Sequence, residues 1–149
     1  MKKSIIALLV LLVICAVLWA ATGNEDAVLT SSVERRNQEP LIKPVWEHVI
    51  TWTYDADDAG AETQELPVNG ILLKVIMKLP LTTTTGTTEQ LLILDNGDNT
   101  IFDSTEVGEN ATHTFNVYEP VTGTLDVILE PSAASGDAVT TKVITLRGI

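Results

Sequence analysis

Residues 45–54 read VWEHVITWTY, and the alternation in this stretch decides the fold class. Every second residue carries a large or aromatic side chain: Trp46, His48, Ile50, Trp52 and Tyr54. Such side chains share one face of a β-strand, because successive side chains in a strand point to opposite faces. We expect this face to pack in the core of a sheet. The alternative is an exposed aromatic platform on which a sugar stacks.

Outward from this stretch, the chain continues in short alternating segments separated by turn residues. The clearest are ILLKVIMKLP (71–80), EQLLILD (89–95), THTFNVYE (112–119), TGTLDVILE (122–130) and VTTKVITLR (139–147). Asn69–Gly70 predicts a tight turn, and Pro67 before it indicates a strand edge or strand end. About eight strands at a spacing of roughly 8–12 residues are typical of a sandwich or barrel. We predict an all-β domain over residues 45–149, folded as a single antiparallel, jelly-roll-like β-sandwich.

The N-terminus carries an uncharged apolar run from Ile5 to Ala21, preceded by two lysines. Seventeen residues exceed the apolar core of an ordinary secretory signal and reach the lower length limit of a membrane-spanning helix. We therefore predict that residues 1–23 are a retained transmembrane helix or uncleaved signal. Its lipid-facing residues include Ile5, Leu8, Leu12 and the interfacial Trp19. A cleaved signal and a lipidated Cys15 are the alternatives.

Between this segment and the sandwich, residues 24–44 are polar and show no sustained apolar period. A stretch of this kind cannot bury enough apolar surface to fold alone, so we predict an extended linker or stalk. Its basic side chains are Arg35, Arg36 and Lys43. We expect these three residues to contact acidic partners on adjacent chains.

The charge balance restricts the classes of partner. The chain has 20 acidic and 9 basic residues, which gives a formal net charge of −11. A surface of this kind repels phosphate backbones, so no nucleic-acid partner is expected. Cys15 is the only cysteine, so no disulfide can form within the chain. An exported domain without disulfides is expected to gain stability from an oligomeric assembly.

One acidic turn is a candidate metal site. The stretch DNGDNTIFD at 95–103 supplies oxygen ligands from Asp95, Asp98, Asn99 and Asp103, and Ca²⁺ binds such clusters. Asp and Asn also favour plain hairpin turns through local hydrogen bonds, which is the competing interpretation. No other cofactor is expected. Neither His48 nor His113 belongs to a catalytic motif, and no G-x-S-x-G is present, so no enzymatic activity is expected.

The order of the turn and strand motifs resembles a group of small β-rich virion structural proteins of tailed phages and prophages. The motifs that carry the resemblance, over roughly residues 50–149, are Thr51–Trp52, Asp55–Gly60, Asn69–Gly70, Thr82–Thr88, Asp95–Asn99, Gly123–Leu125 and Val139–Arg147. Those proteins lack a membrane segment. The resemblance and the leader together imply a membrane-anchored minor capsid protein of a membrane-containing phage. It would tie the bilayer to the shell, with lipid and other capsid proteins as partners and the virion as its location.

A second function fits the same residues. An exported bacterial surface protein would carry the same leader and a similar sandwich, and would recognise a sugar or a protein through its loops. It would lie in the cell envelope, with its domain outside the cytoplasm.

Overall fold

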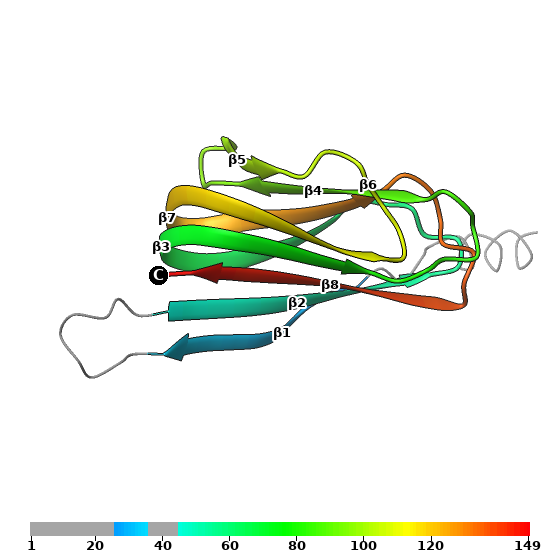
Figure 1. Cartoon of the computed structure of the whole chain (residues 1–149), viewed down its shortest axis with the longest axis horizontal. Helices are drawn as coiled ribbons and strands as arrows, with labels where there is room; N and C mark the ends of the chain where they lie inside the picture. The colour runs from blue at the N-terminus through cyan, green and yellow to red at the C-terminus, as the bar shows by residue number, and fades with distance from the viewer. Residues whose placement is uncertain (1–25, 36–44) are drawn as a thin grey trace, which may run out of the picture.

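The regular elements of this computed structural model, which describes residues 26–35 and 45–149, are all β-strands (Figure 1). They are β1 (Asp26–Arg35), β2 (Val45–Asp55), β3 (Glu62–Leu79), β4 (Thr88–Leu94), β5 (Thr100–Asp103), β6 (Val107–Gly108), β7 (Ala111–Pro131) and β8 (Val139–Gly148). Their order is β1-β2-β8-β3-β7-β4-β5, with β6 beside β4, and every pairing is antiparallel. The predicted all-β antiparallel class is confirmed.

Two long strands, β3 and β7, pass from one layer of the structure to the other. They pair along nearly their whole length, from Glu62 opposite Leu129 to Leu79 opposite Ala111. Only residues 72–78 of β3 also pair with β8, and only residues 126–131 of β7 also pair with β4. We call β1, β2, β8, residues 71–79 and residues 111–120 layer A. Layer B comprises residues 62–70, residues 121–131, β4 and β5.

The change of layer occurs at glycines. Gly70 has φ +142° and lies opposite Val121, and Gly123 has φ +86° and lies opposite Val68. Residues other than glycine rarely adopt such φ values, so both strands can bend here while their pairing continues. The tight turn predicted at Asn69–Gly70 is therefore wrong: the chain bends inside one strand instead of reversing. The segments 112–119 and 122–130 are likewise one strand, β7, for the same reason.

The C-terminal residues close this corner. Ile149 N–H donates to Ile71 O (3.1 Å), and Ile71 N–H donates to Ile149 O (2.7 Å). The indole of Trp46 lies over Gly148, where an added Cβ would stand 2.1 Å from a ring carbon. The close approach of a large ring to the backbone explains why glycine occupies this position.

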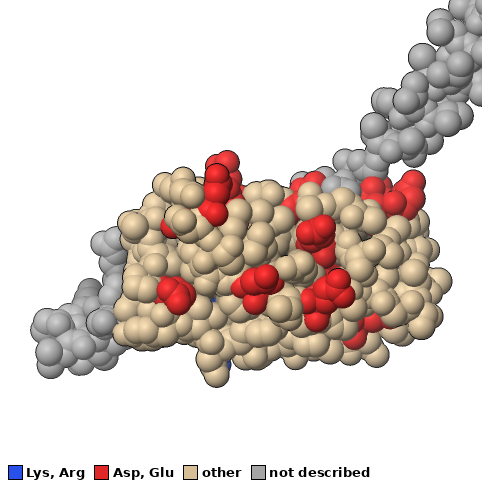
Figure 2. Space-filling model, turned by 90° about the horizontal axis from the view of Figure 1, so that it is seen from above, with Lys and Arg blue, Asp and Glu red and all other residues tan. Residues whose placement is uncertain are grey.

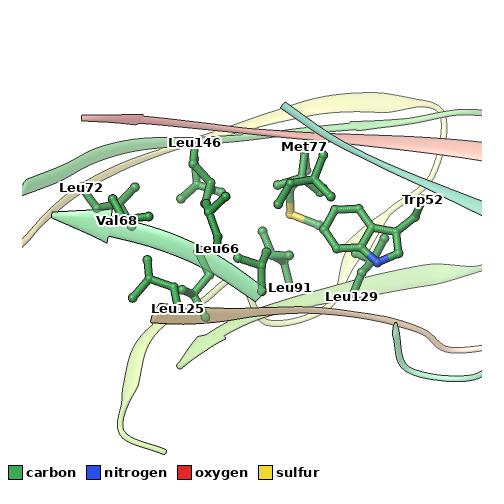
Figure 3. Close-up of a cluster of buried hydrophobic side chains, with 14 of the residues drawn as sticks. Trp52, Leu66, Val68, Leu72, Met77, Leu91, Leu125, Leu129 and Leu146 are labelled. Carbon is green, nitrogen blue, oxygen red and sulfur yellow. The ribbon is translucent and has the colours of Figure 1, made fainter. Parts of the chain in front are cut away.

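The core lies between the two layers and receives side chains from both (Figure 3). Trp52, Met77 and Leu146 come from layer A, whereas Leu91 and Leu129 come from layer B. All five are fully buried. The aromatic face of β2 is also buried, which confirms the predicted core role of Trp46, Trp52 and Tyr54 and excludes these three as an exposed sugar platform. The ring of His48 packs 5.3 Å from that of Trp46.

The predicted linker differs from the structure over residues 26–35. These residues form β1, which pairs with β2 from Asp26 opposite Thr53 to Arg35 opposite Val45. An edge strand needs backbone hydrogen bonds to only one neighbour, so a polar sequence can form it without an apolar period. Arg36 and Lys43 lie outside the described residues.

Two other predictions concern the ends of the chain and of the sheet. The predicted anchor, with Ile5, Leu8, Leu12 and Trp19, lies outside the described residues. Across the ranges that are described, no helix has the length and apolar character needed to cross a bilayer. Pro67 lies in the part of β3 that pairs only with β7, which confirms its predicted edge position.

The first testable prediction concerns the corner. Gly148→Ala places a methyl group against the Trp46 ring and should lower the free energy of unfolding by about 1–3 kcal/mol, as overpacking does. Gly108→Ala is the matched control, because an added Cβ there meets nothing within 4 Å. Thermal unfolding of both variants measures the difference. Equal stability of the two variants would contradict the packing described here.

Candidate functional site

Four loops meet at the end of the sandwich where β2 finishes: residues 56–61, 80–87, 104–110 and 132–138. Backbone hydrogen bonds join them: Thr84 N–H donates to Ser135 O (2.9 Å), Gly136 N–H to Ala56 O (3.0 Å) and Asn110 N–H to Pro80 O (2.9 Å). We call this connected surface the loop end. The opposite end carries the corner and the C-terminal residues (Figure 1).

The threonine-rich loop is fixed by one carboxylate. Glu109 Oε2 accepts hydrogen bonds from Thr82 N–H (2.7 Å), from the Thr82 hydroxyl and from the Thr87 hydroxyl (3.1 Å). Its Oε1 accepts from Gly86 N–H (3.2 Å). The hydrogen bonds from Thr82, followed by the weaker ones from Thr87 and Gly86, hold the pKa of Glu109 below its usual value. The loop is thus ordered by the ionised form of Glu109.

Two further carboxylates at the loop end serve the same structural purpose. Asp137 accepts from Thr83 N–H (3.1 Å) and from the Thr83 hydroxyl, which ties the threonine-rich loop to the segment before β8. The carboxylate of Asp58 is buried and accepts from Asp55 N–H (3.1 Å), so it closes the acidic turn after β2. Each of these carboxylates therefore accepts hydrogen bonds from its own loops.

Beneath the loop end lies a buried ion pair that connects the two layers. Lys142 Nζ on β8 is 2.7 Å from Glu89 Oε1 on β4, and each side chain is only 3% exposed. Strands β8 and β4 are not neighbours in the sheet, so this contact crosses the interior. Lys142 Nζ also lies 4.1 Å from the centre of the Tyr54 ring, a cation–π arrangement. The Tyr54 hydroxyl in turn donates to Leu129 O (3.2 Å).

Burial dominates the electrostatics of this pair. Loss of water raises the pKa of Glu89 above its usual value, and the attraction of Lys142 offsets part of that rise. Glu89 Oε2 is buried and accepts no hydrogen bond from the described residues. Removing either member of the pair would leave the other as an uncompensated buried charge, which destabilises the fold. Each member of the pair therefore requires the other.

Sequence reasoning did not single out this pair, although a signal exists. Lys142 shares its strand face with Ile144 and Leu146, and Glu89 shares its face with Leu91 and Ile93. Two opposite charges at inward-facing positions of different strands indicate an ion pair across the core.

A polar pocket of about 310 Å³ lies on the outer face of layer B. Its polar lining consists of Thr88, Gln90, Glu106, Glu130 and Ser132. Two of its groups already bind Thr88: Ser132 Oγ accepts from Thr88 N–H (2.9 Å) and Glu106 Oε2 accepts from the Thr88 hydroxyl (3.3 Å). The pocket therefore presents hydroxyl, amide and carboxylate groups without an aromatic wall.

Of the four residues proposed as calcium ligands, Asp95 and Asn99 hydrogen bond each other: Asn99 Nδ2 donates to Asp95 Oδ1 (3.0 Å) and Oδ2 (3.1 Å). Asp95 Oδ1 accepts from Gly97 N–H (2.8 Å) and Asn99 N–H (2.9 Å), and these bonds, led by that from Asn99, lower the pKa of Asp95. Asp103 Oδ1 accepts from Thr105 N–H (2.7 Å) and from the Gln90 side chain (2.9 Å). Asp98 adopts φ +57° in the turn. In residues 26–35 and 45–149, no three acidic, histidine or cysteine side chains gather to hold a metal ion. The hydrogen bonds that Asp95 accepts are those of a hairpin turn, and the calcium site stays a prediction.

The same turn docks on the corner. Asn96 Oδ1 accepts from Thr124 N–H (2.7 Å), and a Cβ on Gly123 would lie 2.7 Å from Asn96 Nδ2. The β4–β5 loop is thus held against the bend of β7. Arg35, one of the predicted partner contacts, is the last residue of β1. The ring of His113 hydrogen bonds Gly108 O (2.7 Å).

The surface is strongly acidic. Asp and Glu side chains recur across the face shown in Figure 2, where Lys and Arg are almost absent from view. This distribution agrees with the formal net charge of −11. It disfavours contact with polyanions on that face.

No protein-family model matches the chain, and no curated protein matches it in sequence. In structure it is similar to the C-terminal family 22 carbohydrate-binding module of Clostridium thermocellum Xyn10B, at 11% identity and a TM-score of 0.39, over 87% of this chain and 88% of that one. It is also similar to the carbohydrate-binding module TmCBM61 (10% identity, TM-score 0.38, 85% of this chain and 88% of that one). A chain of infectious bursal disease virus, Gt strain, matches at 9% identity and a TM-score of 0.30, over 85% of this chain and 32% of that one. Similarity at this level carries no argument about function.

The second prediction concerns the ion pair. Lys142→Met leaves the Glu89 carboxylate buried without its cation and should cost about 3–5 kcal/mol of stability, whereas Lys142→Met with Glu89→Leu should recover most of that loss. The exposed Lys78→Met serves as the matched control. Chemical denaturation measures all three variants. A double variant as unstable as the single one would show that the pair does not act as a unit.

The third prediction concerns acid stability. A carboxylate whose pKa is lowered in the folded state stabilises it above the pKa of the unfolded chain, and that stability is lost as pH falls through the folded pKa. The melting temperature of the wild type should therefore fall as pH drops below about 4.5, the ordinary pKa of glutamate. Glu109→Gln should be less stable at neutral pH and show a smaller acid-dependent loss. The exposed Glu119→Gln should keep the wild-type profile.

Proposed function

We propose that this protein is a virion structural protein: a membrane-anchored minor capsid protein of a membrane-containing phage, which ties the bilayer to the protein shell. Its role is non-catalytic, and its partners are lipid and other capsid proteins. The motif order over residues 50–149 supports the virion assignment, and the apolar run from Ile5 to Ala21 supports the anchor.

The position of Asp26 is the observation that carries the proposal. Asp26 begins β1 and lies opposite Thr53, near the finish of β2, so the chain enters the sandwich at the loop end. Only residues 22–25 separate it from Ala21, and five peptide steps span about 17 Å at most. If residues 5–21 cross the bilayer, the loop end faces the lipid directly. The corner, with Ile149, then faces away from the lipid.

This geometry determines how far the protein reaches from the bilayer. A linker over residues 24–44 would allow a long and variable reach between bilayer and shell. Because residues 26–35 are part of the sheet, the reach is instead the length of the sandwich itself. The carboxylates of the loop end would repel anionic headgroups, so the proposal also favours a zwitterionic lipid surface.

The alternative function, an exported bacterial surface module, is favoured by one observation. The pocket on the outer face of layer B has a volume and a polar lining that suit a small polar ligand such as a sugar unit. Two observations argue against sugar binding. The aromatic residues of β2 are buried, and Tyr118 is the one exposed large aromatic side chain in the described part of the chain.

The fourth prediction tests the leading function. In purified membrane-containing particles, the chain should occur at a fixed ratio to the major shell protein and remain with the lipid when the shell is removed. Its intact mass should include residues 1–23. Quantitative mass spectrometry measures both the ratio and the mass.

Two outcomes would contradict the proposal in different ways. Recovery of the chain only from cell envelopes, and never from particles, would favour the surface module. A mass that corresponds to a chain starting near Asn24 would show that the leader is cleaved. The protein would then be a shell protein that is not anchored in the bilayer. As a further discriminator, Glu130→Ala should change glycan binding only if the pocket of layer B holds a sugar.

A further inference from the structure

The sandwich has four sheet edges, and they differ in how they resist pairing with another chain. In layer A the edges are β1 and residues 111–120 of β7; in layer B they are residues 62–70 of β3 and β5. An exposed strand edge offers unpaired backbone groups to a neighbouring chain, and proteins usually block it with charges, proline, bulges or short length.

Three of the four edges carry such a feature, whereas in the β7 edge the register shift, Glu119 and Pro120 all lie beyond Asn116. The pairing of β1 with β2 shifts register between Leu29 and Ser31, which marks a bulge. The β3 edge contains Pro67 with Glu62 and Glu65. The β5 edge is only four residues long. Each feature lowers the capacity of that edge to accept another strand.

The β7 edge lacks these features from Ala111 to Asn116. This segment reads ATHTFN, without an acidic or basic residue other than His113, and without proline or glycine. It pairs with β3 in one unbroken register, from Ala111 opposite Leu79 to Asn116 opposite Lys74, and the register shifts only beyond it. Thr112, Thr114 and Asn116 point outward and are exposed, followed by Tyr118 at 73% exposure. On a chain with a formal net charge of −11, this is a regular strand edge free of acidic residues.

We propose that residues 112–116 of β7 pair antiparallel with the same residues of a second copy, which extends layer A across a two-fold axis. A second copy is the fitting occupant because the segment is neutral and self-complementary, whereas the other edges of this chain are blocked. Antiparallel pairing of one segment with itself is isologous and closes as a dimer.

The sheet geometry also fixes the register. Residues directly opposite each other in an antiparallel pair have side chains on the same face. The two-fold axis must therefore pass through a residue and not between two residues. With the axis at Thr114, Thr112 faces Asn116 of the second copy, and His113 faces Phe115 of the second copy. An axis at His113 would instead set two imidazoles against each other.

Charge substitution at Thr114 tests both the edge and the register. The full chain is purified in detergent, and its mass is measured by analytical ultracentrifugation. Thr114→Lys and Thr114→Glu should each raise the dimer dissociation constant about tenfold or more, because like charges then stand directly opposite each other. A mixture of the two variants should dimerise again, since each lysine then faces a glutamate.

The matched control is Thr141→Lys, which places the same charge at an exposed position of β8, in the interior of layer A, and should leave dimerisation unchanged. A monomeric wild type, or charged variants that remain dimeric, would overturn the proposal. A mixture that stays monomeric would overturn the Thr114 register. If the charged variants fail to fold, Thr114→Cys in a Cys15→Ser background supplies the second measurement: a disulfide between copies supports the pairing, and its absence under oxidation refutes it.

Discussion

The backbone pairing between β3 and β7 is the constraint on which the rest of the structure depends. The two strands stay hydrogen bonded from Glu62 opposite Leu129 to Leu79 opposite Ala111. Because both bend together near Gly70 and Gly123, one ribbon supplies strands to both layers. The layers are therefore linked by continuous backbone and not only by side-chain packing. Strand β8 adds to one half of the ribbon and β4 to the other half, so the positions of these strands follow from it.

The ion pair between Lys142 and Glu89 adds a second link at the far end of the sandwich. A buried pair of this kind contributes little net stability compared with well-packed apolar groups, but a misaligned layer would leave both charges buried alone. We interpret the pair as a device that fixes how β8 and β4 face each other. The corner and the pair hold the layers together at opposite ends, and the apolar core fills the space between them.

Much of this architecture is visible in the sequence, and the exceptions have physical causes. The alternation of residues 45–54 predicts both β2 and its buried face, because burial of one face requires that period. The break at Asn69–Gly70 is also visible, but the sequence alone does not distinguish a reversal from a bend, since both use a glycine with positive φ. Strand β1 escapes detection because an edge strand is held by backbone hydrogen bonds, which leave no apolar pattern. The role of Asp95 as a turn acceptor matches one of its two predicted interpretations.

The position of β8 has a consequence for how the chain acquires its structure during synthesis. Strand β8 is the last in the chain, yet it lies between β2 and β3 in layer A. While the ribosome still holds residues 139–148, no backbone pairing joins the early strands β1 and β2 to the ribbon, and the inner edge of β2 is open. Pairings of such large sequence separation form slowly, and an open apolar edge is prone to aggregation in the meantime. The domain therefore reaches its final fold only after residues 139–148 have left the ribosome. Until that moment, the open edge of β2 is a place where two copies of the chain can pair wrongly.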